Sequence, residues 1–329
     1  MRKAFVTGAN GFVGSALVRR LLHDGVAVRA MCRTPEKGKS LGEAGAEVVG
    51  GDVQDARCLG RYVEGCDAVF HVAAVGDGTA AYQYNINVRG TQFVAEAAQK
   101  AHVDRVVHVS SVAVYGIGVN GPIQTSQPPG RNRDYFYGQT KALGENALWA
   151  YSKQTGLPVV SVRPAFVYGP GSGFWSRGLY QLCARSMMPL VDGGNGNAHP
   201  IYIDDLVDLL VTSATHPDAP GHVFHAAPDP APTWRDYLGY YIHMVGLTLD
   251  TATFPLTPDR INLLYLPGKA LTLLTRLTGQ PRDIIGLIDY LGSRATYIMD
   301  DAAQRLGWRP KFSLEQGMAF TEPWLKGLK

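Results

Sequence analysis

A tyrosine and a lysine four residues apart, Tyr137 and Lys141, are the side chains whose types and spacing best suit the movement of a proton. In a helix, this spacing puts both side chains on one face. A free tyrosine has a pKa of about 10, too high for an efficient base at neutral pH, and a nearby ammonium group would lower that pKa. Such a pair could exchange a proton with an alcohol oxygen while a hydride leaves or joins the same carbon. Because the spacing is also common on ordinary helices, it needs support from the rest of the chain.

That support comes from a glycine-rich stretch near the start of the sequence, Thr7-Gly8-Ala9-Asn10-Gly11-Phe12-Val13-Gly14. The stretch follows the apolar run 3–6 and opens the amphipathic run 12–23, a pattern that predicts a strand, a turn and a helix. The first glycine would allow the tight turn, the second would let the backbone approach a pyrophosphate, and the third would let helix and strand pack closely. The helix N-terminus would add N–H donors and a positive dipole end, so the stretch predicts a dinucleotide site.

Further apolar runs predict the rest of a parallel sheet. Periodicity also predicts a helix over 85–100, and the segment 116–133, rich in Gly, Pro and polar residues, is interpreted as a long functional loop. The remaining predicted strands lie within 26–31, 46–53, 67–74, 106–111, 157–164 and 222–226.

Composition limits the classes to which the chain can belong. At 329 residues, with 46% hydrophobic residues and a net charge of +3, it can form one large α/β domain plus a smaller appendage. The absence of a basic run argues against nucleic acid or a membrane surface as a partner. The four cysteines lack metal-ligand spacing, and the chain begins with a predicted strand instead of a signal peptide, so we expect a reducing cytoplasm and no metal site. The run 261–277 is too interrupted to span a bilayer, because it contains Pro267, Lys269 and Arg276.

The end of the second predicted strand indicates which dinucleotide fits. An NAD site usually carries an acidic residue there to bind the ribose 2′-hydroxyl, whereas an NADP site carries a cation. This chain has Cys32 and Arg33, and an arginine could pair in bidentate fashion with a 2′-phosphate. We therefore predict NADP as the preferred cofactor and NAD as the alternative. A solvated loop cation is the other explanation for Arg33.

The glycine spacing and the Tyr-x-x-x-Lys motif together resemble the extended branch of the short-chain dehydrogenase/reductase family, which is NAD-dependent epimerase/dehydratase-like. The resemblance runs from residue 3 to about residue 318. It implies an α/β fold, a Rossmann doubly wound parallel sheet with a smaller, mostly C-terminal substrate-binding cap. The implied dinucleotide-binding domain spans 1–164 and returns at about 197–227, the cap spans 165–196 and 228–329, and a homodimer is expected. Further matching motifs are Ser110-Ser111-Val112-Ala113-Val114-Tyr115-Gly116, Arg163-Pro164-Ala165-Phe166-Val167-Tyr168-Gly169-Pro170 and Leu306-Gly307-Trp308-Arg309-Pro310.

The resemblance also implies roles for individual residues. Ser111 would contact the substrate oxygen, with Ser110 in that role if the register is off by one, and Lys141 would also hold the nicotinamide ribose. Asp52 would lie beside the adenine, and Asn87 would have a structural or cofactor-positioning role. The implied catalytic residues are Ser111, Tyr137 and Lys141. The implied cofactor-binding residues are Gly8, Asn10, Gly11, Phe12, Val13, Gly14, Arg33, Asp52, Val53, Ala73, Tyr137, Lys141 and Pro164.

Several absences bear on the type of family member. Dehydratases and decarboxylases of this family carry acidic residues directly after the active-site Ser or Thr, where this chain has Val112 and Ala113. Nucleotide-sugar epimerases generally pair an Arg with the sugar diphosphate, where this chain has His199, although Arg177 or Arg185 could compensate. Both readings therefore lose support.

The apolar segments 263–267, 270–277 and 283–291 resemble the caps of hydroxysteroid and dihydroflavonol-type reductases. They could line a pocket for an apolar ketone or alcohol, and cap core or a dimer contact explains them equally well. We predict a cytoplasmic, NADP-preferring dehydrogenase or ketoreductase that acts on the secondary alcohol/ketone pair of an apolar small molecule. A nucleotide-sugar epimerase with tightly bound NAD is the alternative. A non-enzymatic NADP-sensing protein is a third hypothesis, although such relatives commonly lose the Tyr or Lys that this chain retains.

Overall fold

The computed structural model describes residues 1–130, 135–257, 259, 261 and 284–328. The apolar segments predicted to line the cap, 263–267 and 270–277, lie outside the described residues, as does the first residue of 283–291. The rest of that third segment forms a helix.

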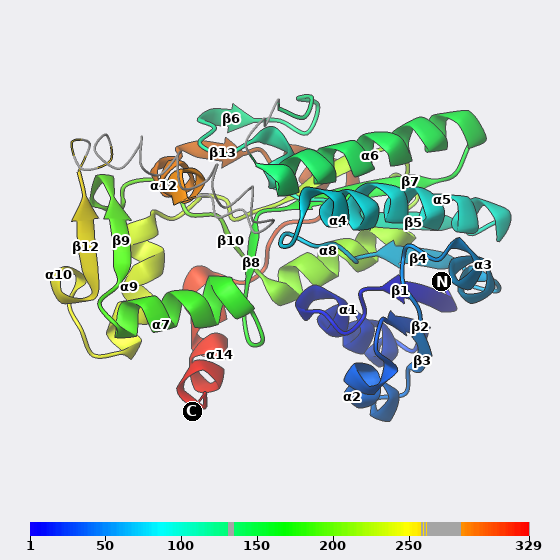
Figure 1. The fold of residues 1–329 in the computed structure, drawn as a ribbon, viewed down its shortest axis with the longest axis horizontal. Helices are drawn as coiled ribbons and strands as arrows, with labels where there is room; N and C mark the ends of the chain where they lie inside the picture. Colours follow the sequence, from blue (N-terminus) through cyan, green and yellow to red (C-terminus); the bar gives the residue numbers. More distant parts are fainter. Residues whose placement is uncertain (131–134, 258, 260, 262–283, 329) are drawn as a thin grey trace.

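A seven-stranded parallel sheet forms the centre of the molecule, in the order β11-β7-β5-β4-β1-β2-β3 (Figure 1). Its central strands are runs of buried residues such as Phe5, Val107 and Val162, as expected for a parallel sheet that is covered on both faces. The strand order reverses between β1 and β4, the kind of switch point where open α/β sheets bind ligands. The predicted doubly wound parallel sheet is therefore confirmed. The strands are β1 Lys3–Thr7, β2 Ala27–Cys32, β3 Glu47–Gly50, β4 Ala68–His71, β5 Arg105–Val109, β7 Val159–Pro164 and β11 Val223–Ala226.

Helices cover both faces of this sheet (Figure 1). One face carries α1, α2 and α8, and the other carries α3, α4, α5 and α6. The predicted helix over 85–100 is confirmed in type, but helical structure begins earlier, at Ala80, and includes a turn of π-helix, η2. These elements are α1 Phe12–His23, η1 Pro35–Gly38, α2 Lys39–Glu43, α3 Ala56–Val63, α4 Ala80–Tyr84, η2 Asn85–Arg89, α5 Gly90–Lys100, η3 Val112–Tyr115, α6 Phe136–Thr155 and α8 Ile203–Thr215.

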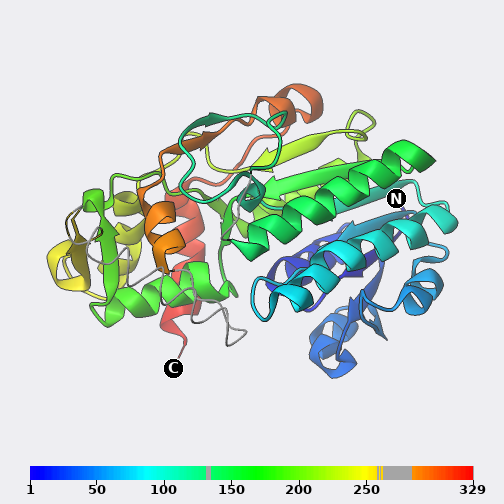
Figure 2. The same ribbon diagram turned by 45° about the horizontal axis from the view of Figure 1, so that its top comes forward.

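Most of the remaining elements, called the cap elements below, gather at one end of the sheet, away from the N-terminus (Figures 1 and 2). Three parallel strand pairs connect them, β8 with β10, β9 with β12, and β6 with β13. The segment 116–133, predicted to be a loop, contains the strand β6 because residues 121–123 pair with β13, which is distant in sequence. The cap elements are β6 Gly121–Ile123, β8 Phe166–Tyr168, η4 Gly173–Gly178, α7 Leu179–Ala184, β9 Met188–Val191, η5 Asp192–Gly194, β10 Pro200–Tyr202, α9 Trp234–Met244, α10 Leu249–Ala252, β12 Thr253–Leu256, α12 Ile284–Gly292, β13 Ala295–Tyr297, α13 Asp300–Leu306 and α14 Leu314–Lys326.

Aromatic rings fill the interior of the cap elements. Phe166 stacks on Trp175 and Trp234 with ring centroids 4.6 and 5.3 Å apart, and Tyr237 lies 5.2 Å from the same ring. Large aromatic side chains bury much apolar area, so this cluster holds together segments from η4, β8 and α9. None of the helices in the described part of the chain is long and apolar enough to cross a bilayer.

Candidate active site

The glycine turn lies between the end of β1 and the start of α1. Gly8 has φ +64°, a conformation that favours glycine, and a Cβ added there would lie 2.8 Å from the Cα of Ala73. A Cβ on Gly14 would lie 2.2 Å from the carbonyl oxygen of Gly8, so any side chain there would push the helix off the turn. These two positions therefore need glycine for the reasons predicted, a tight turn and close packing of helix on strand.

The N-terminus of α1 is suited to an anion. Its N-cap is Gly11, no side chain of the described residues caps it, and its first turn holds no acidic residue. Its N–H groups and positive dipole end are thus available, as a pyrophosphate requires. The turn and the helix end together fit the phosphates of a dinucleotide.

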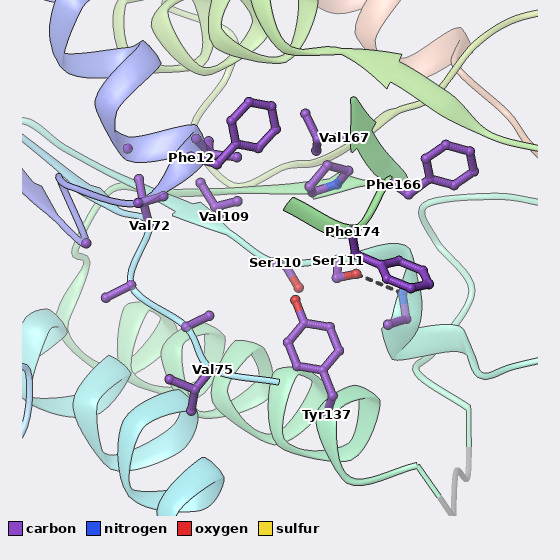
Figure 3. A pocket seen from close by; sticks show the side chains of 18 of the residues that line it. Phe12, Val72, Val75, Val109, Ser110, Ser111, Tyr137, Phe166, Val167 and Phe174 are labelled. Atoms are coloured by element: carbon purple, nitrogen blue, oxygen red, sulfur yellow. Dashed lines mark hydrogen bonds between the residues drawn. The ribbon is translucent and has the colours of Figure 1, made fainter. Parts of the chain in front are cut away.

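A cavity of about 780 Å³ runs from this turn to the cap elements (Figure 3). It brings together all of the predicted catalytic and cofactor-binding residues except Lys141, which is buried beneath it. The predicted residues that line the cavity are Gly8, Asn10, Gly11, Phe12, Val13, Gly14, Arg33, Asp52, Val53, Ala73, Ser111, Tyr137 and Pro164.

Arg33 and Asp52 lie at the nucleotide end of this cavity, after β2 and β3 respectively. The exposed Arg33 guanidinium donates a hydrogen bond of 2.6 Å to the hydroxyl of Tyr82. Asp52 accepts a 2.9 Å hydrogen bond from the backbone N–H of Gln54. β2 ends in Cys32, at the position where an NAD-binding protein typically carries an acidic residue. The cation Arg33 follows directly.

Ser111 and Tyr137 meet at the middle of the cavity. Ser111 is the N-cap of η3, where its Oγ accepts the N–H of Ala113 at 3.1 Å (Figure 3). Tyr137, in the first turn of α6, points its hydroxyl toward the 110–111 segment (Figure 3). The Ser110 Oγ is buried and has no hydrogen-bond partner among the described residues. Both serines line the cavity beside Tyr137, and Ser111 as the residue that contacts the substrate oxygen stays a prediction.

Lys141 lies one helical turn from Tyr137, with only 2% of its surface exposed. Its Nζ donates a 2.7 Å hydrogen bond to the carbonyl oxygen of Val109, at the end of β5. Burial lowers the pKa of Lys141 to about 8, against the opposing effect of Glu145. The expectation that Lys141 lowers the pKa of Tyr137 is wrong for this structure, because burial raises that pKa and the hydrogen bond from Ser111 is what opposes the rise.

Two other polar residues near the site have structural contacts. The amide of Asn87 bonds to both the N–H and the carbonyl of Val75, at 2.9 and 2.8 Å, and to Thr140 Oγ1 at 2.9 Å, so it fixes the segment after β4 against α6. His71, expected to pack within its strand, is buried between Thr7 and Thr91, and burial lowers its pKa to about 3. This imidazole is neutral at physiological pH.

Sequence reasoning predicted part of the far end of the cavity, since Leu287 and Tyr290 belong to the apolar segment 283–291, and it missed the other residues there. The residues at this end are mostly aromatic and come from the segment before α6 and from β8, η4, α12 and β13, so no local pattern connects them. Phe166 was noted only as one of the variable positions of the motif at 163–170. These residues are Tyr135, Phe166, Phe174, Trp175, Leu287, Tyr290 and Tyr297.

The residues considered for binding a sugar diphosphate do not line the cavity. His199 is buried, its Nε2 lies 2.9 Å from the carbonyl oxygen of Ala295, and burial lowers its pKa to about 4. Arg177 and Arg185 are exposed and do not line the cavity. No group of three or more His, Cys, Asp or Glu in the described chain could hold a metal ion.

A comparison with known proteins matches the part of the chain that carries these features. Residues 4–227, which carry the glycine turn, Ser111, Tyr137 and Lys141, match the model of the NAD dependent epimerase/dehydratase family. The chain belongs to this family. The predicted resemblance to the extended short-chain dehydrogenase/reductases is thereby confirmed.

Two curated relatives of this family member are reductases by name. The chain is 28% identical over 324 residues, 96% of its length and 94% of the relative's, to a 4-hydroxy-2-methyl-3-oxo-4-farnesyl-3,4-dihydroquinoline-1-oxide ketoreductase of Stigmatella aurantiaca. It is 29% identical over 328 residues, 96% of its length and 97% of the relative's, to a 2-alkyl-3-oxoalkanoate reductase of Stenotrophomonas maltophilia. Among solved structures, a dTDP-glucose 4,6-dehydratase of Streptomyces venezuelae with NAD bound superposes with a TM-score of 0.78 at 23% identity, covering 99% of this chain and 97% of the other. That likeness shows the fold.

Proposed function

We propose that this family member is an NADP-preferring ketoreductase that acts on the secondary alcohol/ketone pair of an apolar small molecule, with Tyr137 as the acid and base. The distribution of charge in the cavity carries the proposal. Arg33 and Asp52 are the charged side chains among the described lining residues, and both lie at the nucleotide end. The end beyond Tyr137 is lined by aromatic and apolar side chains, which suit an uncharged, apolar substrate.

The nucleotide end supports NADP. The free N–H groups of α1 would hold the pyrophosphate, and Asp52 would lie beside the adenine. Arg33 would pair with the 2′-phosphate, which a carboxylate at the same place would repel. When bound, the nicotinamide would supply a hydride to the carbonyl carbon or accept one from the carbinol carbon.

The protonation state of Tyr137 supports reduction. Burial raises the pKa of this phenol, so it carries its proton at neutral pH and can give it to a carbonyl oxygen. Ser111, which lines the same cavity as Tyr137, would orient that oxygen and stabilise the charge that develops on it. Lys141 would contribute a positive charge behind the pair. The names of the two curated relatives, a ketoreductase and a reductase, agree with this direction.

The epimerase hypothesis needs a cation beyond Tyr137 to hold a sugar diphosphate. The described residues that line that part of the cavity provide none, and His199 is committed to a backbone carbonyl. The hypothesis of a non-enzymatic sensor does not explain why the chain retains both Tyr137 and Lys141.

The test is turnover by the purified protein with NADPH and a panel of apolar ketones: α-tetralone, a decalone and an alkylated β-ketoester. UDP-glucose and dTDP-glucose serve as the epimerase probes. We expect at least one ketone to be reduced, neither sugar nucleotide to be converted, and Tyr137→Phe to lower kcat by about 10²–10⁴-fold. Sugar-nucleotide epimerisation with no ketone reduction would contradict the proposal, and undiminished reduction by Tyr137→Phe would contradict the role of Tyr137.

A further inference from the structure

A buried ion pair lies beneath the catalytic residues and is not explained by the reaction described so far. Arg163 on β7 and Glu145 on α6 are 5% and 1% exposed, and Arg163 Nη2 lies 2.5 Å from Glu145 Oε1. Arg163 Nε also donates to both carboxylate oxygens, at 3.1 and 3.2 Å. Apolar residues of similar size could fill such a site without the cost of removing two charges from water, so the pair indicates a role other than stability.

The pair is placed to act on the site. Tyr137, Lys141 and Glu145 follow one another at intervals of four residues, so they share one face of α6. Arg163 also reaches across to the Tyr115 hydroxyl, with its Nη1 2.5 Å away. Tyr115 ends η3, the turn that Ser111 caps. The ion pair thus connects the helix of Tyr137 and Lys141 with the turn of Ser111.

Titratable groups from several elements interact with the ammonium group of Lys141. His71 on β4 and His108 on β5 face it, and burial, with a smaller effect of Lys141, holds the pKa of each imidazole far below its usual range, so both are neutral. Arg163 on β7 adds to the lowering of the His108 pKa. The Glu145 carboxylate is the anion of the described chain that acts on Lys141, and it opposes the burial that lowers the lysine pKa.

We propose that Glu145, fixed in place by Arg163, is a positioning residue that keeps the Lys141 ammonium group charged and bound to Val109 during proton transfer at Tyr137. Only the kinetic consequence of this inference rests on the proposed function. Its electrostatic part, the effect of Glu145 on Lys141, holds whatever the substrate.

The kinetic test uses Glu145→Gln, which removes the charge and preserves the shape. Because a lost opposite charge lowers the pKa of a lysine, Lys141 should lose its proton at lower pH. The alkaline decline of kcat for the ketone that the wild-type protein reduces fastest should therefore move down by about one pH unit. We expect the KM for the ketone to change little and Glu145→Asp, which restores the charge, to return the decline toward its original pH.

The matched control is Glu43→Gln on α2, which makes the same change of net charge at an exposed carboxylate far from the site. It should leave the pH profile unchanged. A profile of Glu145→Gln that coincides with the wild-type profile would overturn the inference, and so would an equal loss in Glu145→Asp and Glu145→Gln, because that result would indicate packing instead of charge.

A second measurement is independent of activity. The side-chain signal of Lys141 can be titrated by NMR in protein with isotope-labelled lysine and assigned by its loss in Lys141→Arg. We expect a lower Lys141 pKa in Glu145→Gln than in wild type, and an unshifted pKa would overturn the inference even if no ketone is reduced. If Glu145→Gln does not fold, Glu145→Asp takes its place: withdrawing the carboxylate should shift the Lys141 pKa less, in the same direction, and no shift would overturn the inference.

Discussion

At the scale of single residues, the acid–base chemistry depends on burial, which sequence spacing does not reveal. The spacing of Tyr137 and Lys141 correctly indicated that they share a helix face, and it led to the expectation of a lowered tyrosine pKa. In the structure, burial raises the pKa of Tyr137 and lowers the pKa of Lys141. The roles of Ser111 and of the cofactor-binding residues remain predictions, now supported by their shared cavity.

Arg33 carries the argument for NADP and can be tested alone. In Arg33→Ala the 2′-phosphate would lose a charge-assisted contact, so the Kd for NADPH should rise by about 10- to 100-fold while the Kd for NADH changes little. Fluorescence titration of each reduced nucleotide measures both constants. Arg57→Ala, at an exposed arginine on α3 that does not line the cavity, is the control. Equal affinities of the wild-type protein for NADPH and NADH would remove the basis for the NADP preference.

At the scale of elements, short-range patterns predicted those parts whose causes are local. The apolar strands and the glycine turn could be predicted from adjacent residues, because the central strands are runs of buried residues and Gly8 and Gly14 are required within one turn. The strand β6 was missed because its partner β13 lies in the last part of the chain. The aromatic cluster around Phe166 and the Arg163–Glu145 pair also join residues that are distant in sequence, so neither could be predicted.

The glycine turn makes a prediction about stability. A Cβ on Gly14 would overlap the Gly8 carbonyl, so Gly14→Ala should lower the free energy of unfolding by about 1–3 kcal/mol or more. Gly60→Ala is the matched control, because Gly60 is exposed within α3 and a Cβ there meets no atom within 4 Å. That variant should raise the free energy of unfolding by about 0.5–1 kcal/mol. Denaturant titration measures both, and a Gly14→Ala protein as stable as wild type would show that helix and strand do not pack this closely.

At the scale of the whole molecule, the cavity connects the switch point of the sheet with the cap elements. Its charges are confined to the nucleotide end in the described residues, which separates the part that would bind the cofactor from the part that would bind the substrate. The predicted division, 1–164 with a return at about 197–227 against 165–196 with 228–329, remains a prediction, and it places two of the cap elements, β6 and β10, in the nucleotide-binding part. The homodimer and the cytoplasmic location remain predictions from the sequence.

Transfer of deuterium tests the central claim most directly. NADPH deuterated at the transferable position would be mixed in excess with the protein and an apolar ketone, and the product alcohol would be analysed by mass spectrometry. We predict that the carbinol carbon carries the label and that labelled alcohol accumulates to many times the amount of protein, because the cofactor leaves after each turnover. The account would be contradicted if no labelled alcohol forms while the protein retains NAD tightly and converts a sugar nucleotide. That result would identify an epimerase.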